Sequence, residues 1–356
     1  VPLADASWVP LHLFLAGGLV LAISAVSLML TVTWSAAPAP VDGWVALQRA
    51  CIAGGVVGIA VGRELSEALL VVSAVAHTAG LVLLAVLLAV TVRRGVERRF
   101  DPAVVAYVAA LAAGVAGACL GAVMGSRGAA VHWRSAHIAL NVLGLVGLVV
   151  GGTLPFFAAT VGRSRMHRRA TRRRLVATVL WLVGALVLAV VGIGLDHTAL
   201  ARIGTAAYAL GIVGVVSLLP TPTRRQLVWA GPRLVGLWAG AAWWAAAVVA
   251  AAVTLVPGEG VVFPRPWLLA LVVAGYGQIL WGSLASLLPM LRGGGHVALA
   301  EGFAATRSWP GLVAANVAGL ALVAGAPRVA VAAAGARLAD TIVRAARVDF
   351  GRRRAR

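Results

Sequence analysis

Four histidines recur at a nearly constant spacing along this sequence. His12, His77, His137 and His197 are separated by 65, 60 and 60 residues, and each stands near the front of a long apolar stretch. Imidazoles that lie at one level on several packed helices can together bind a metal ion or a haem iron. The pattern therefore predicts a shared metal or haem site.

The histidines divide into two groups by their surroundings. His77 and His137 stand inside apolar stretches, where an ionisable side chain is rare and usually functional. For His12, which follows Trp8, a role as ligand and an interfacial hydrogen bond both stay open. We predict that two among His12, His77 and His137 hold the metal or the haem iron. The other histidines are expected to bind backbone carbonyls at the membrane interface, and these are His132, His167, His197 and His296.

Three further polar residues could support such a site. Asn141 follows His137 by four residues, so both side chains fall on one helix face and the amide could orient the ligand. Arg134 and Arg63 stand at the outer ends of their helices, where they could pair with haem propionates or with lipid phosphates. A haem also needs a flat slot, and small residues near the histidines are available to line it: Ala79, Gly80, Gly144 and Gly147.

Other polar side chains within apolar stretches have simpler interpretations. Gln278 could line a polar cavity or form hydrogen bonds between helices. Arg337, Asp340 and Arg344 are spaced by three and four residues, which puts them on one helix face where their charges can pair. We interpret this triad as a self-neutralised face packed against other helices.

The composition is that of a membrane protein. Of the 356 residues, 61% are hydrophobic and 12% are charged, and the mean hydropathy is +0.97. Soluble domains are about 45–50% apolar and about 25% charged. Two cysteines exclude a disulfide scaffold, and no nucleotide-binding loop or His-Glu-x-x-His motif is present. The net charge of +19 comes from arginines that stand between the apolar stretches, which indicates topology and lipid contact rather than nucleic-acid binding.

The apolar stretches predict an all-α, polytopic transmembrane helical bundle in a single domain of residues 1–356. The hydrophobic segments do not alternate with polar residues, so a β-barrel is excluded. About eleven spans are expected, at residues 9–34, 44–62, 67–92, 102–125, 136–161, 175–195, 198–219, 233–256, 266–290, 309–326 and 328–345.

The arginines also predict an orientation. Connections after the third, fifth and seventh spans and the C-terminal tail are arginine-rich, with the densest run between Arg163 and Arg174. The alternate connections hold one or two arginines each. By the positive-inside rule, we expect a protein of the bacterial plasma membrane. Its N-terminus lies outside the cell and its C-terminus lies in the cytoplasm. The three predicted ligands then belong to the outer half of the membrane.

A short motif repeats at the ends of several odd-numbered spans. Val26–Leu30, Val216–Pro220 and Ala285–Pro289 share a Ser-Leu pattern, at multiples of about 65 residues. The repeat has two interpretations. Either the bundle is built from duplicated helix pairs, or the motif recurs by chance because Ser-Leu pairs are common in apolar sequence.

Three stretches resemble a known membrane module. They are His12-Leu-Phe-Leu-Ala-Gly-Gly, continuing to Leu-Thr-Val-Thr-Trp34; His137-Ile-Ala-Leu-Asn-Val-Leu-Gly, continuing to Gly-Thr-Leu-Pro155; and Tyr276-Gly-Gln-Ile-Leu-Trp-Gly-Ser-Leu-Ala-Ser-Leu-Leu-Pro289. They are similar to the multi-spanning module that precedes copper-nitrite-reductase-type multicopper oxidase domains in actinobacteria. That module is distantly similar to haem–copper oxidase subunit I and to the NnrS family.

The resemblance implies haem or copper handling without oxygen reduction. Related sequences often carry another histidine just before the position of His137, where Ser135 and Ala136 stand here. The histidine pair and the His-x-x-x-Tyr helix of an oxidase dinuclear centre are absent as well. The leading hypothesis is a membrane electron-transfer module that binds haem b or copper and passes electrons from quinol to an extracytoplasmic copper protein. A cofactor-free transporter and a membrane scaffold for a partner oxidase are the alternatives.

Overall fold

A computed structural model of the chain describes residues 8–128, 130–255 and 263–350. Every regular element in these ranges is a helix, and the described part contains no strand. The predicted all-α bundle is thus confirmed. The chain folds as two compact units, of residues 1–152, 172–207 and 255–262 and of residues 153–171, 208–254 and 263–356.

Nine helices of the described part are long and apolar enough to cross a membrane. They are Trp8–Trp34, Asp42–Leu65, Glu67–Arg94, Asp101–Arg127, Val131–Val161, Arg172–Gly194, Thr198–Ser217, Pro232–Thr254 and Arg265–Arg292. Large apolar side chains on these helices stay exposed, among them Val72, Val75 and Leu210. Such an apolar exterior requires a lipid bilayer around it.

The expected count of eleven spans is not supported. The tenth expected span forms helix α16 (Trp309–Val323), which has only 15 residues. The eleventh forms α17 (Pro327–Phe350), which is long enough but carries Arg337, Asp340 and Arg344 among its 24 residues. A spanning helix needs roughly 20 predominantly apolar residues, so the short helix and the charged helix both depart from the expectation.

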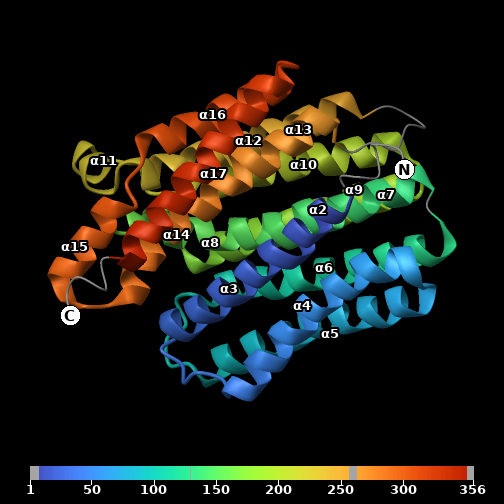
Figure 1. Cartoon of the computed structure of the whole chain (residues 1–356), viewed down its shortest axis with the longest axis horizontal. Coiled ribbons are helices and arrows are strands. Elements are labelled where there is room, and N and C mark those ends of the chain that lie inside the picture. Colours follow the sequence, from blue (N-terminus) through green and yellow to red (C-terminus); the bar gives the residue numbers. More distant parts are fainter. Residues whose placement is uncertain (1–7, 129, 256–262, 351–356) are drawn as a thin grey trace. The chain divides into compact units, whose positions relative to one another are not determined.

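The first unit contains the N-terminal spans. Its elements are α2 (Trp8–His12), η1 (Leu13–Leu19), α3 (Val20–Trp34), α4 (Asp42–Leu65), α5 (Glu67–Arg94), α6 (Asp101–Arg127), α7 (Val131–Ala139), η2 (Leu140–Gly147) and α9 (Arg172–Gly194). α4, α5 and α6 follow one another as adjacent helices (Figure 1). Leu81, Leu84 and Leu88 of α5 and Tyr107 of α6 are fully buried.

The second unit contains the C-terminal helices. They are α11 (Arg224–Ala230), α12 (Pro232–Thr254), α13 (Arg265–Ala270), η3 (Leu271–Tyr276), α14 (Gly277–Arg292), α15 (Gly295–Ala305), α16 and α17. Helices α8 (Leu148–Val161) and α10 (Thr198–Ser217) each continue from the first unit into the second. Trp244 of α12 is fully buried and packs edge to face on Tyr208 of α10, with ring centroids 6.1 Å apart.

Three of the spans contain a π-helical segment. The segments are η1, η2 and η3, and they begin 127 and 131 residues apart. π-Helical turns widen the hydrogen-bonded ring and are often found at functional sites. The first segment starts directly after His12, and the second starts three residues after His137.

Candidate metal-binding site

The structure brings His12 and His137 together. His12 ends α2 and His137 lies in α7, and their ring centroids are 6.4 Å apart with the ring planes inclined by 18°. Both side chains are half-buried. Two of the three predicted ligands, 125 residues apart in the sequence, therefore face each other in the first unit.

Both imidazoles are held by the same kind of hydrogen bond. Nδ1 of His12 lies 2.9 Å from the Trp8 carbonyl oxygen, and Nδ1 of His137 lies 2.8 Å from the Gly117 carbonyl oxygen. A carbonyl oxygen only accepts, so each Nδ1 must carry the proton and donate it. The lone pair is then on Nε2 of each ring. This tautomer, fixed by a hydrogen bond from Nδ1 to a backbone carbonyl oxygen, is one that metal-binding histidines commonly adopt.

Glycines of α6 make room for the side chains from α7 and η2. A Cβ at Gly121 would stand 2.9 Å from Cε1 of His137, and a Cβ at Gly117 would collide with the Asn141 amide. Asn141 donates from Nδ2 to the His137 carbonyl oxygen at 2.8 Å. The predicted position of Asn141 on the His137 face is thus seen, and its amide anchors the helix backbone beside the ring.

An aromatic and a cationic group extend the histidine pair. The Trp8 ring stacks on His12, with centroids 3.9 Å apart and planes inclined by 23°. Cζ of Arg63 lies 4.2 Å from the Trp8 ring centroid, and its Nε lies 3.9 Å from Glu64. Arg63, Trp8, His12 and His137 therefore form one continuous stack, which we call the histidine stack. Arg134 is exposed on α7, three residues before His137.

His77 occupies a different environment. Its side chain is 5% exposed, and its Nδ1 lies 3.4 Å from the Ile52 carbonyl oxygen of α4. In the described ranges no ring contact joins His77 to His12 or to His137, and no group of three or more His, Cys, Asp or Glu side chains is placed to hold a metal ion. The structure pairs His12 with His137 and places His77 against α4.

Two of the four small residues expected to line a haem slot, Gly80 and Gly144, lie at helix contacts, whereas Ala79 is exposed. A Cβ at Gly80 would stand 2.8 Å from Ile52, and a Cβ at Gly144 would stand 2.6 Å from the Cβ of Ala113. These glycines allow close packing of neighbouring helices. The space around them is filled by protein atoms.

The sequence held a signal for the α6 contact that our sequence analysis did not use. Gly117, Gly121 and Gly125 recur every four residues on one face of α6, the spacing typical of a close helix contact. Two of these glycines cradle Asn141 and His137. A second feature that was not predicted is the buried pair of Ser24 and Gln48. The Ser24 hydroxyl donates to Oε1 of Gln48 at 2.7 Å.

Polar side chains of the second unit are paired with one another. Gln278 and Asn316 exchange hydrogen bonds, with Asn316 Nδ2 donating to Gln278 Oε1 at 3.0 Å, and Trp243 Nε1 donates to Asn316 Oδ1 at 2.9 Å. Gln278 therefore forms hydrogen bonds between helices, and it also lines a small pocket. Asp340 lies 3.6 Å from Arg337 and 3.2 Å from Arg344, as the interpretation of a self-neutralised face requires.

No protein-family model matches the chain, and no curated protein matches it. The functional interpretation therefore rests on the geometry of the histidine stack.

Proposed function

We propose that this protein is a membrane electron-transfer module that binds copper or haem through His12 and His137. The observation that carries the proposal is the facing pair of imidazoles, each with its Nδ1 bonded to a backbone carbonyl oxygen. Such a pair offers two neutral nitrogen ligands without a carboxylate or thiolate. Imidazole binds copper and iron well.

The two imidazoles lie close enough to reach one ion. Their ring centroids are 6.4 Å apart and their planes are nearly parallel, so a shared ion requires the rings to turn until both Nε2 atoms face it. A haem would need more room, because Gly117 and Gly121 are already covered by Asn141 and His137. We therefore favour copper, with haem b as the second choice.

The resemblance to the module ahead of copper-nitrite-reductase-type domains supplies the context. His12 and His137 would hold the metal, which would supply one-electron redox chemistry when bound. Trp8 covers one face of the His12 ring, Arg63 lies over Trp8, and together they would limit access of water. In this proposal the protein lies in a bacterial plasma membrane with its N-terminus outside. Quinol is the donor, an extracytoplasmic copper protein is the acceptor, and the pathway is nitrogen-oxide or copper redox metabolism.

A cofactor-free transporter is the alternative function, and one observation favours it. Three spans are interrupted by π-helical segments, and transporters use irregular helices at their substrate sites. Against it, Gln278 and Asn316 satisfy each other inside the second unit, so they do not offer free groups to a substrate. A membrane scaffold for a partner oxidase would need neither the π-helical segments nor the buried amide pair.

Metal analysis and optical spectra of purified protein test the proposal. Protein from copper- and haem-replete cells should carry close to one metal per chain, and His12→Ala or His137→Ala should each lower that content at least roughly tenfold. His132→Ala is the matched control, because His132 lies on α7 beside Trp133 and should leave the content unchanged. Colourless, metal-free wild-type protein, or variants that keep the full metal content, would refute the proposal and favour transport.

A further inference from the structure

Three arginines from separate segments of the second unit lie close together, and two of them lie over aromatic rings. Cζ of Arg163 lies 3.7 Å from the Trp229 ring centroid, and Cζ of Arg233 lies 4.4 Å from that of Phe303. The Arg307 side chain crosses Gly231, where an added Cβ would stand 3.1 Å from its Nε. We call Arg163, Arg233 and Arg307 the arginine cluster.

The arginine cluster concentrates positive charge without a carboxylate. Arg163 and Arg307 are exposed at its rim, whereas Arg233 is only 4% exposed. Arg307 and Arg163 both repel the Arg233 guanidinium. In the described part of the chain, none of the three has a carboxylate within 4.0 Å, although four other ion pairs form there.

Backbone carbonyls satisfy only part of Arg233. Its Nε donates to the Ala230 carbonyl oxygen at 3.2 Å, and one Nη donates to the Trp229 carbonyl oxygen at 3.3 Å. A guanidinium has five N–H donors. Arg233 also stands in the first turn of α12, where the amide groups of a 23-residue helix add positive potential. An anion would satisfy the remaining N–H donors of this buried cation better than further carbonyl groups would.

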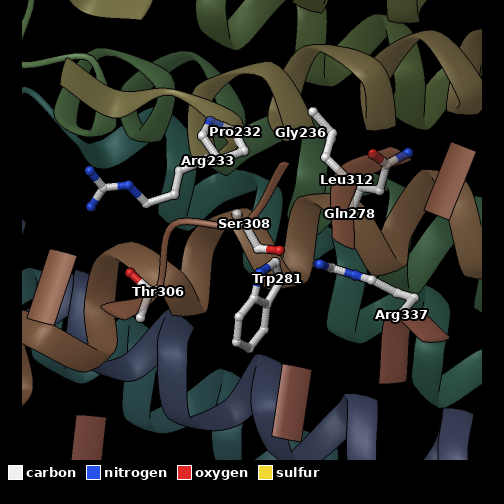
Figure 2. Close-up of a pocket in the computed structure, with 10 residues that line it drawn as sticks. Pro232, Arg233, Gly236, Gln278, Trp281, Thr306, Ser308, Leu312 and Arg337 are labelled. Carbon is white, nitrogen blue, oxygen red and sulfur yellow. The ribbon is translucent and has the colours of Figure 1, made fainter. Parts of the chain in front are cut away.

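The arginine cluster is separate from the Arg337–Asp340–Arg344 triad. Arg233 and Arg337 both line one small pocket with Gln278 and Ser308, but they diverge within it. In Figure 2 the Arg337 guanidinium reaches toward Ser308 and Trp281, whereas that of Arg233 points away from them. The charge of Arg337 is matched by Asp340. That of Arg233 is not matched by any carboxylate in the described ranges.

We propose that the arginine cluster is a binding site for a phosphate-type oxyanion, carried by a phospholipid headgroup or present as free phosphate. Planar guanidinium groups suit the paired oxygens of a phosphate, and several of them can share one anion. The site stands where helices begin and end: Arg163 follows α8, Arg233 is the second residue of α12, and Arg307 lies between α15 and α16. Lipid phosphates occupy this level of a membrane protein. Trp229 and Phe303 form an apolar wall beside it, with ring centroids 5.7 Å apart.

Ligand-dependent thermal unfolding of the full-length protein in a nonionic detergent tests the site. One arm adds short-chain phosphatidylglycerol, with the matching diacylglycerol as a control without phosphate. The other arm adds inorganic phosphate, with chloride at the same ionic strength so that general screening is constant. Wild-type protein is compared with Arg163→Gly, Arg307→Gln and Arg233→Gln. Arg168→Gln is the matched control, because Arg168 is exposed in the same connection as Arg163 and outside the cluster.

The site predicts a saturable rise in the unfolding midpoint of wild-type and Arg168→Gln protein. Loss of one guanidinium should weaken the apparent affinity at least roughly tenfold in the cluster variants. Arg163 has a left-handed backbone with φ of 48°, so glycine removes the charge without straining the chain, and this variant remains informative if Arg233→Gln does not fold. A response to phosphatidylglycerol alone identifies a lipid headgroup, and a response to inorganic phosphate identifies a free anion. No response in wild-type protein, or an equal response in cluster and control variants, would overturn the proposal.

Discussion

The backbone of Gly55 on α4 lies directly against His77 on α5. A Cβ placed at Gly55 would stand 2.7 Å from the Cβ of His77, closer than real Cβ atoms approach. Gly58 meets Ser73 and Gly62 meets Leu70 in the same way further along the two helices. Glycines on one face of α4 thus let α5 approach until backbone atoms touch, and His77 is buried at this contact rather than at the histidine stack.

Substitution of Gly55 should separate α4 from α5. We expect Gly55→Ala to destabilise the protein by about 1–3 kcal/mol, because overpacking a close helix contact displaces backbone atoms. Gly54→Ala is the control on the same helix, since nothing lies within 4 Å of an added Cβ there. Thermal unfolding in detergent should show a lower midpoint for the first variant and no decrease for the second. Equal midpoints would contradict the contact.

Trp8 should determine how well His12 is oriented. The indole stacks on the His12 ring and its own carbonyl oxygen binds Nδ1, so Trp8→Leu removes the stack but keeps the hydrogen bond. We expect roughly tenfold weaker copper binding by this variant, the size of effect usual for groups that position a ligand. Trp8→Phe should restore most of the affinity. Trp133→Leu on α7 serves as the control, and competition with a colorimetric copper chelator provides the measurement.

The chemistry of the histidine stack could be predicted from the sequence only in part. Residue spacing predicts which side chains share a helix face, and Asn141 does lie beside His137. Spacing does not predict how each helix is rotated about its axis against its neighbours. That rotation is set by the small residues at the contacts, and it turns His77 of α5 toward Gly55 and Ile52 of α4. The near-regular spacing of the histidines could not distinguish these outcomes.

The π-helical segments lie at positions that no sequence motif marked. The π-helical segments fall in the first, fifth and ninth spans, at roughly twice the helix-pair period of about 65 residues read from the Ser-Leu motif. No residue signature marks their positions, because η1, η2 and η3 share only apolar residues and glycine. The composition predicted the helices, but it did not indicate where π-helical segments interrupt them.

Gln278 and Asn316 should behave as one energetic unit. Each amide completes the hydrogen bonds of the other, and Asn316 also accepts from Trp243. We expect Asn316→Leu and Gln278→Leu each to cost about 1–3 kcal/mol, because a buried amide is left unpaired. The double variant should cost less than the sum, with a coupling energy of about 0.5–3 kcal/mol in a double-mutant cycle of unfolding free energies. Additive costs would show that the two amides do not depend on each other.

The pairing of Asp340 with two arginines should make it the sensitive member of the triad on α17. Asp340→Asn leaves Arg337 and Arg344 without their shared counter-charge, and their side chains are only 12% and 20% exposed. We expect a lower unfolding midpoint for this variant. Glu301→Gln on the exposed face of α15 should leave the midpoint unchanged, although it removes the same charge. If both variants unfold alike, the buried pairing does not contribute to stability.

The orientation predicted from the arginines can be tested by cysteine labelling in intact cells. Cys51 and Cys119 are free, so both are first replaced by serine. Arg168→Cys then places a thiol in the arginine-rich connection, and Leu195→Cys places one at an exposed position between α9 and α10. A membrane-impermeant maleimide should label Leu195→Cys in intact cells and Arg168→Cys only after permeabilisation, because arginine-rich connections stay in the cytoplasm. The reverse pattern would place the histidine stack in the inner half of the membrane. Metal binding by His12 and His137 would survive that result, but electron transfer to an external copper protein would not.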